Sequence, residues 1–194
     1  MQTFPNKETF FANYNKGLSQ VVWTNCIADL ETPVSAMLKI VKGRPNSFLL
    51  ESVEGGSIRG RYSFIGFKPD IIWRCSNDKA EINREADFAP DAFSPCPISE
   101  KFGALKSLRQ FRDESRIKMP PEMPPMASGL VGYMAYDTVR LKEKIPDKNP
   151  DVLGLPDSIF VRPTIMAVFD SLEDTITIVT PVWCKTLITA EDAF

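Results

Sequence analysis

The chain has 194 residues, of which 43% are hydrophobic and 25% are charged, and its formal net charge at pH 7 is −2. This composition is ordinary for a globular domain, and the charge balance gives no sign of binding to nucleic acid or to an anionic membrane. The N-terminus has neither the basic nor the apolar region of a signal peptide, and no apolar run reaches the roughly 20 residues of a membrane span. We therefore expect a cytoplasmic protein with no nucleic acid and no membrane as partner.

The residue types that most often carry chemistry are scarce. Histidine is absent, which excludes Ser–His and Cys–His nucleophiles and any zinc site that uses His. The cysteines are dispersed without a CxxC pair, so we expect reduced thiols in packing roles. Asp147 and Asp151 lie in a polar stretch and are interpreted as turn formers. The sequence predicts no catalytic residue and no metal site within this segment.

The first third of the chain is expected to mix short helices with strands. Residues 7–15 predict a helix, and residues 21–24 predict a strand. A second helix is predicted over 29–40, where Thr32 can cap the helix and Pro33 suits its first turn.

The strongest local pattern in the sequence predicts a β-hairpin. Its arms are expected at 48–53 and 59–66, with Gly55-Gly56 in the turn. Two further short strands are predicted at 70–75 and 79–83.

The middle of the chain predicts a helix over 98–112, with Ser99 as its cap and an apolar stripe along one face. The Met/Pro run at 119–125 cannot be regular structure, and we interpret it as a stiff connector rather than a polyproline ligand. The run from Gly129 to Asp137 has the small and apolar residues of a buried strand.

The last third predicts a second hairpin, with arms at 163–170 and 175–180. Hairpins with interspersed helices and no regular βαβ series predict an α+β fold with a mostly antiparallel sheet. Thr189 looks like the N-cap of another helix, and the chain ends after barely one further turn. We therefore expect this chain to be part of a longer protein.

The first hairpin also gathers a candidate binding site. Glu51, Ser52 and Arg61 would supply an acceptor, a hydroxyl and a cation around one turn, which are the groups needed to hold a zwitterionic amino acid. Spacing alone favours the simpler interpretation that these charges are solvated. Successive strand residues also point to opposite faces, so Glu51 and Ser52 can reach one ligand only if the strand ends or bulges there.

Several segments carry a resemblance to a known family. They are Asp29–Ala36, Phe48–Gly66, Gly129–Asp137, Leu155–Asp157 and Val168–Asp170. Together they resemble the chorismate-utilising enzymes, and most strongly component I, the large subunit, of anthranilate synthase. The resemblance implies that residues 1–194 form the N-terminal regulatory domain of that sandwich fold, and that the catalytic domain with its chorismate and Mg²⁺ sites is absent from this chain.

By the same resemblance, the parent enzyme converts chorismate and ammonia to anthranilate and pyruvate in tryptophan biosynthesis. The ammonia comes from glutamine through an amidotransferase subunit or domain, and L-tryptophan inhibits by feedback. Glu51, Ser52 and Arg61 match the inhibitor site, with Arg61 facing the ligand's carboxylate, and Glu51 either attracting its ammonium or holding Arg61. The alternatives are the same region of aminodeoxychorismate synthase, in folate synthesis, and a stand-alone amino-acid-binding module.

Overall fold

The computed structural model describes residues 2–54, 58–146, 148, 150–184 and 188–194, with the backbone alone described for 52–54, 58 and 59. Contacts divide the chain into two compact units. The first unit comprises residues 1–68, 117–129 and 163–194, and the second comprises 69–116 and 130–162. None of the helices in the described part of the chain combines the length and apolar character that a membrane span requires.

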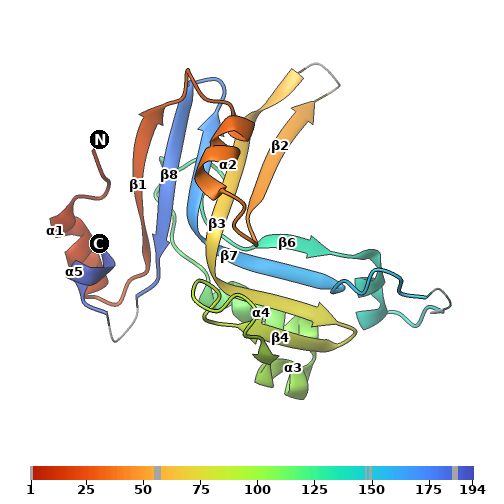
Figure 1. The fold of residues 1–194 in the computed structure, drawn as a ribbon. Coiled ribbons are helices and arrows are strands. Elements are labelled where there is room, and N and C mark those ends of the chain that lie inside the picture. The colour runs from red at the N-terminus through yellow and green to blue at the C-terminus, as the bar shows by residue number, and fades with distance from the viewer. Residues whose placement is uncertain (1, 55–57, 147, 149, 185–187) are drawn as a thin grey trace. The chain divides into compact units, whose positions relative to one another are not determined.

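The fold is α+β with antiparallel strand pairing, as the sequence predicts (Figure 1). The strands hydrogen-bond in the order β1-β8-β7-β3-β4-β5, with β2 beside β3 and β6 beside β7. The strands are β1 (Gln20–Ile27), β2 (Phe48–Glu54), β3 (Ile58–Ser76), β4 (Lys79–Asn83), β5 (Ser94–Pro95), β6 (Val131–Met134), β7 (Ser158–Asp170) and β8 (Thr175–Val182). The helices are α1 (Lys7–Tyr14), α2 (Pro33–Val41), α3 (Pro97–Phe102), α4 (Ala104–Glu114), the 3₁₀ helix η1 (Tyr136–Leu141) and α5 (Ala190–Ala193).

In the first unit, alternate residues of the strands enter two apolar clusters. Phe64 of β3 belongs to one cluster and its neighbour Ile65 to the other, because side chains alternate across a strand. Ala36 of α2 packs in the cluster of Ile65. The Met/Pro connector lies against the other cluster, where Met119 and Met123 pack and Ala127 is buried. It is therefore irregular, as predicted, and it serves as part of the packed structure.

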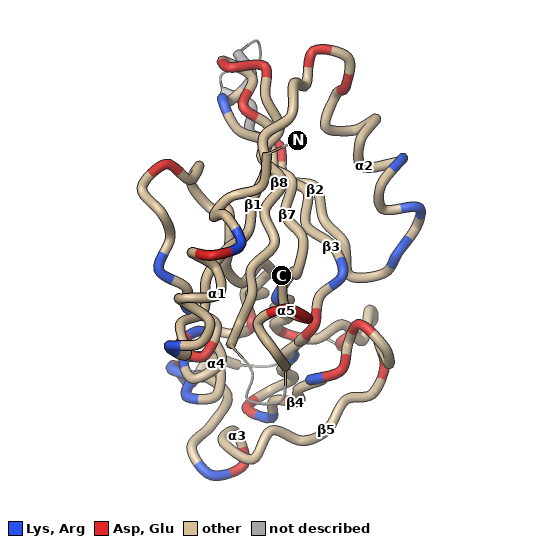
Figure 2. The backbone as a smooth tube through the Cα atoms, turned by 90° about the vertical axis from the view of Figure 1, so that its left-hand side faces the viewer, with Lys and Arg blue, Asp and Glu red and all other residues tan. Residues whose placement is uncertain are grey.

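The second unit packs α3 and α4 against β4 around a core that contains Trp73 and Phe111. Trp73 is 1% exposed, and its indole Nε1–H donates to Ser107 Oγ of α4 at 2.9 Å. The exposed residues of α4 are largely charged, with Lys106, Arg109 and Arg112 beside Asp113 and Glu114. Figure 2 marks charged residues in colour along the backbone. This division into a buried and a charged face agrees with the stripe predicted from the sequence.

Two expected elements differ in where they begin: α2 starts at Pro33 rather than at 29, and β7 starts at Ser158 rather than at 163. Three others were wrong in their continuity or their length. Residues 70–75 are no separate strand, because β3 runs on through Lys68, which adopts φ +50° just before a proline. The helix predicted over 98–112 is divided at Gly103, which has φ +83°. Ser99 is not its cap: the Ser99 hydroxyl is buried and accepts the Ala80 N–H.

The third element whose continuity or length differs from expectation is the strand predicted from Gly129 to Asp137. Only Val131–Met134 pairs as β6, and this strand is largely exposed, with Tyr133 at 42% and Met134 at 48%. The chain then turns into η1 rather than continuing as a strand. Small residues here reflect close backbone approach, because a Cβ on Gly132 would collide with Ile159 of β7.

Candidate binding site

A cavity of about 530 Å³ in the first unit contains two of the three predicted site residues, Glu51 and Arg61. Its wall is formed by the start of α2, by β2 and β3, and by the end of β7 with the turn to β8. The volume falls within the range of small-molecule sites. The fold therefore brings the residues of the first hairpin to one hollow.

Arg61 forms a two-point ion pair with Asp170 at the end of β7. Its Nε donates to Asp170 Oδ1 at 2.9 Å, and its Nη2 donates to Oδ2 at 2.7 Å. The bond from Arg61 lowers the pKa of the Asp170 carboxyl below its ordinary value, although burial opposes this, and Asp170 in turn raises the pKa of Arg61. Both groups are therefore ionised at neutral pH.

The turn between β7 and β8 also holds the backbone of Arg61. The N–H and the hydroxyl of Ser171 both donate to the Arg61 carbonyl, at 2.9 and 3.0 Å. Asp170 Oδ1 accepts the N–H of Leu172 at 3.0 Å, which fixes the carboxylate within the turn. Asp170 thus links the local turn to strand β3.

The pairing of β2 with β3 is irregular beside Glu51, but the extra residues lie on β3. Glu51 pairs with Ser63, whereas Val53 pairs with Arg59, so the register shifts across Ser52. Three residues of β3, at 60–62, therefore lie opposite one residue of β2, and the alternation of side chains is relaxed on β3, where Arg61 lies. That β2 itself ends or bulges at Ser52 stays a prediction. The side chain of Ser52 and the turn at Gly55-Gly56 lie outside the described residues.

The start of α2 contributes part of the cavity wall. The Thr32 hydroxyl accepts the Ser35 N–H, and the Ser35 hydroxyl accepts the Thr32 N–H, which forms a capping box and confirms the predicted N-cap. Glu31 forms an ion pair with Lys39, and this bond lowers the pKa of Glu31. These local bonds fix the first turn of α2 beside the cavity.

The cavity combines charge with an apolar wall. Ala28, Pro33, Val34 and Phe169 contribute apolar groups. The carboxylates in its wall are those of Asp29, Glu31, Glu51, Asp170 and Asp174, and the guanidinium of Arg61 is the cation among the described lining residues. Such a hollow suits a molecule with an apolar body and a positive group.

Sequence reasoning missed Asp170 as a partner of Arg61. Val168–Asp170 contributed to the resemblance, yet nothing in the local pattern indicated a pairing across 109 positions of sequence. The start of α2 was likewise predicted as a helix without any role at the site. An Asp that precedes a turn is a common local feature and carries no signal of a distant partner.

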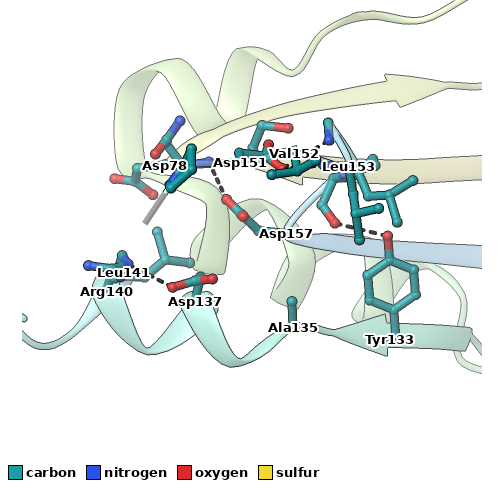
Figure 3. Close-up of a pocket in the computed structure, with 16 residues that line it drawn as sticks. Asp78, Tyr133, Ala135, Asp137, Arg140, Leu141, Asp151, Val152, Leu153 and Asp157 are labelled. Carbon is teal, nitrogen blue, oxygen red and sulfur yellow. Dashed lines mark hydrogen bonds and ion pairs between the residues drawn. The ribbon is translucent and has the colours of Figure 1, made fainter. Parts of the chain in front are cut away.

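A larger cavity of about 990 Å³ lies in the second unit (Figure 3). Its polar groups bind one another: Tyr133 Oη donates to the Pro156 carbonyl, Asp137 pairs with Arg140, and Asp157 accepts the Asn77 N–H. Asp151 accepts the N–H groups of two following residues, which confirms it as a turn former. These groups hold the surrounding loops, so we favour the smaller cavity as the candidate site.

The cysteines have no catalytic arrangement in the described structure. None of the four is in a disulfide, and burial raises the pKa of Cys75 to about 11, which keeps it protonated at neutral pH. Among the described residues no three His, Cys, Asp or Glu side chains gather as ligands of a metal ion would.

Comparison with known proteins gives the family. No protein-family model matches the sequence. The chain is 46% identical to anthranilate synthase component 1 of Cereibacter sphaeroides over 187 residues, which cover 96% of this chain and 37% of the relative. It is a homologue of anthranilate synthase component 1. The component 1 of Thermus thermophilus is 39% identical over 155 residues, which cover 80% of this chain and 30% of that relative.

The fold agrees with a solved component I structure. The crystal structure of anthranilate synthase component I from Streptococcus pneumoniae matches with a TM-score of 0.53 at 18% identity, covering 86% of this chain and 33% of that chain. At this identity the match shows the fold alone. The chain spans about a third of the length of the component 1 relatives that it matches.

Proposed function

We propose that this chain is the N-terminal, tryptophan-sensing part of an anthranilate synthase component 1. The whole enzyme would convert chorismate and ammonia to anthranilate and pyruvate in L-tryptophan biosynthesis. The names of the relatives support the reaction, and the shared third of their length supports the view that residues 1–194 are one part of a longer enzyme. The observation that carries the sensing role is the cavity that joins Glu51 and Arg61 beside an apolar wall.

The groups of the cavity match those of L-tryptophan. Arg61 would bind the α-carboxylate, because a planar guanidinium forms paired bonds with carboxylates. Glu51 would attract the α-ammonium, and Pro33, Val34 and Phe169 would contact the indole ring. Ser52 would add a hydroxyl. Chorismate and Mg²⁺ would bind outside residues 1–194, and a glutamine amidotransferase subunit or domain would supply the ammonia.

The 194-residue chain alone is expected to form no anthranilate from chorismate, Mg²⁺ and ammonia. The described residues hold neither a metal-binding cluster nor a His for general acid–base chemistry. The increase of anthranilate fluorescence with time measures this directly. A rate above that of a protein-free control would contradict the proposal that chorismate and Mg²⁺ bind outside residues 1–194.

In the full-length enzyme, Arg61→Ala and Ser52→Ala are each expected to raise the half-inhibitory concentration of tryptophan at least about tenfold. Each substitution removes a polar contact to the ligand, and losing a charge-assisted bond changes affinity by an order of magnitude. Inhibition curves of anthranilate formation provide the measurement, each scaled to the uninhibited rate of its own variant.

Arg44→Ala is a matched control, because Arg44 is an arginine of the same unit that lies outside the cavity wall. Its inhibition curve should superimpose on that of the unmodified enzyme. If Arg61→Ala and Ser52→Ala also leave inhibition unchanged, the regulatory site has been assigned to the wrong residues.

A further inference from the structure

Arg61 has more hydrogen-bonding capacity than its ion pair uses. A guanidinium carries five N–H donors in a planar fork. Asp170 binds side-on and takes Nε and Nη2. The end-on edge of the fork, made by Nη1 and Nη2, therefore still has the geometry that binds a second carboxylate. Arg61 lines the cavity, and its side chain is 46% exposed.

Asp170 is held more firmly than Arg61. Its side chain is 14% exposed, and the turn fixes it through the Leu172 N–H. Ser171, the next residue, binds the Arg61 carbonyl through both its N–H and its hydroxyl. One short turn thus fixes both the backbone and the side chain of Arg61.

We infer that Asp170 is a positioning residue of the inhibitor site, which holds the Arg61 guanidinium so that its end-on edge faces the ligand's α-carboxylate. This inference rests on the proposed function and deepens it: the ligand class is one that carries a carboxylate for the outer edge of Arg61. Asp170 acts through Arg61 and itself makes no contact with the ligand.

Two opposing effects decide whether Asp170 strengthens or weakens binding of the ligand. Asp170 repels a ligand carboxylate, but the two would lie on different edges of the guanidinium, in a cavity open to water and salt that weaken the repulsion. Without Asp170, the long Arg61 side chain would be free to move, and ligand binding would have to fix it. Positioning therefore outweighs repulsion, and losing the Asp170 charge should weaken binding.

The test uses Asp170→Asn in the full-length enzyme. Asparagine keeps an oxygen for the Leu172 N–H while it removes the charge that holds Arg61. The half-inhibitory concentration of tryptophan, measured against each variant's own uninhibited rate, should rise about tenfold. Tighter inhibition would show that Asp170 competes with the ligand, and would overturn the inference.

Asp174→Asn is the matched control for charge alone. Asp174 lines the same cavity, and its φ of +48° is one that asparagine tolerates well. Asp174→Asn should change the half-inhibitory concentration of tryptophan by less than about threefold, because no described contact joins Asp174 to the Arg61 side chain. An equal effect of both substitutions would mean that the net charge of the cavity, rather than the position of Arg61, sets the affinity.

The double variant separates positioning from a general structural role. If Asp170 acts through Arg61, adding Asp170→Asn to Arg61→Ala should weaken inhibition no further. If the fold-changes of the two single variants multiply in the double variant, the inference is overturned. Unchanged inhibition in Arg61→Ala would remove the proposed site together with the inference, whereas weakened inhibition in Arg61→Ala but not in Asp170→Asn would remove the inference alone.

Discussion

Asp70→Ala is expected to lower the free energy of unfolding by about 3–5 kcal/mol. Asp70 of β3 forms a two-point ion pair with Arg162 of β7, at 2.8 and 2.6 Å, and the two side chains are only 12% and 7% exposed. Removing Asp70 takes away the carboxylate that binds this buried guanidinium at two points. Chemical denaturation of the variant and of the unmodified chain measures the difference.

A surface ion pair on the same strand provides the comparison. Arg74 pairs with Glu81 across β3 and β4, but these side chains are 37% and 41% exposed. Glu81→Ala should therefore cost less than about 1 kcal/mol. Replacing Asp70 and Arg162 together by Leu and Met should cost less than Asp70→Ala alone, because no uncompensated charge is then buried. Equal losses for Asp70→Ala and Glu81→Ala would contradict the role assigned to burial.

Gly132→Ala is expected to separate β6 from β7 and to cost about 3 kcal/mol, the upper end of what overpacking usually costs. A Cβ at this position would lie 1.9 Å from the Ile159 carbonyl oxygen and 2.8 Å from the Phe160 Cα. Both atoms belong to the backbone of β7, so no side-chain rotation relieves the collision. Denaturation gives the loss of stability, and faster amide exchange in β6 would show where it arises.

Gly154→Ala in the same unit is the control for Gly132. Gly154 has φ +60° but no atom within 4 Å of an added Cβ, so this substitution introduces backbone strain of about 1–2 kcal/mol without a collision. If Gly132→Ala costs no more than Gly154→Ala, and β6 amides exchange at their original rate, close approach is not the reason for glycine at position 132.

Local signals in the sequence determined most of the elements. Thr32 and Pro33 predicted the start of α2 because a cap and an N-terminal proline act within a single turn. The alternation of Thr with Ile or Val predicted β8 because side chains alternate on any strand. These predictions succeeded where the deciding interactions lie within a few residues of one another.

Tertiary contacts decided where elements continue or end. The sequence predicted separate strands at 59–66 and 70–75, yet β3 is continuous: Lys68 adopts a left-handed conformation within it, and β3 pairs with β4 from Ile72 onward. Gly103 was included in one long helix, but the structure divides the helix there, and Asp78 accepts the Ala104 N–H at the start of α4. Neither outcome is encoded in the local pattern, because each depends on a neighbour from elsewhere in the chain.

The same distinction between local signals and tertiary contacts applies to the candidate site. The sequence by itself placed Glu51 and Arg61 on one hairpin. Because strand alternation is a local rule, it also required β2 to end or bulge at Ser52, whereas the observed register shift adds its extra residues to β3. Only the tertiary structure brought the start of α2 and Asp170 to the same cavity. The Arg61–Asp170 pair joins residues 109 positions apart, so it exists only because the turn after β7 folds back onto β3.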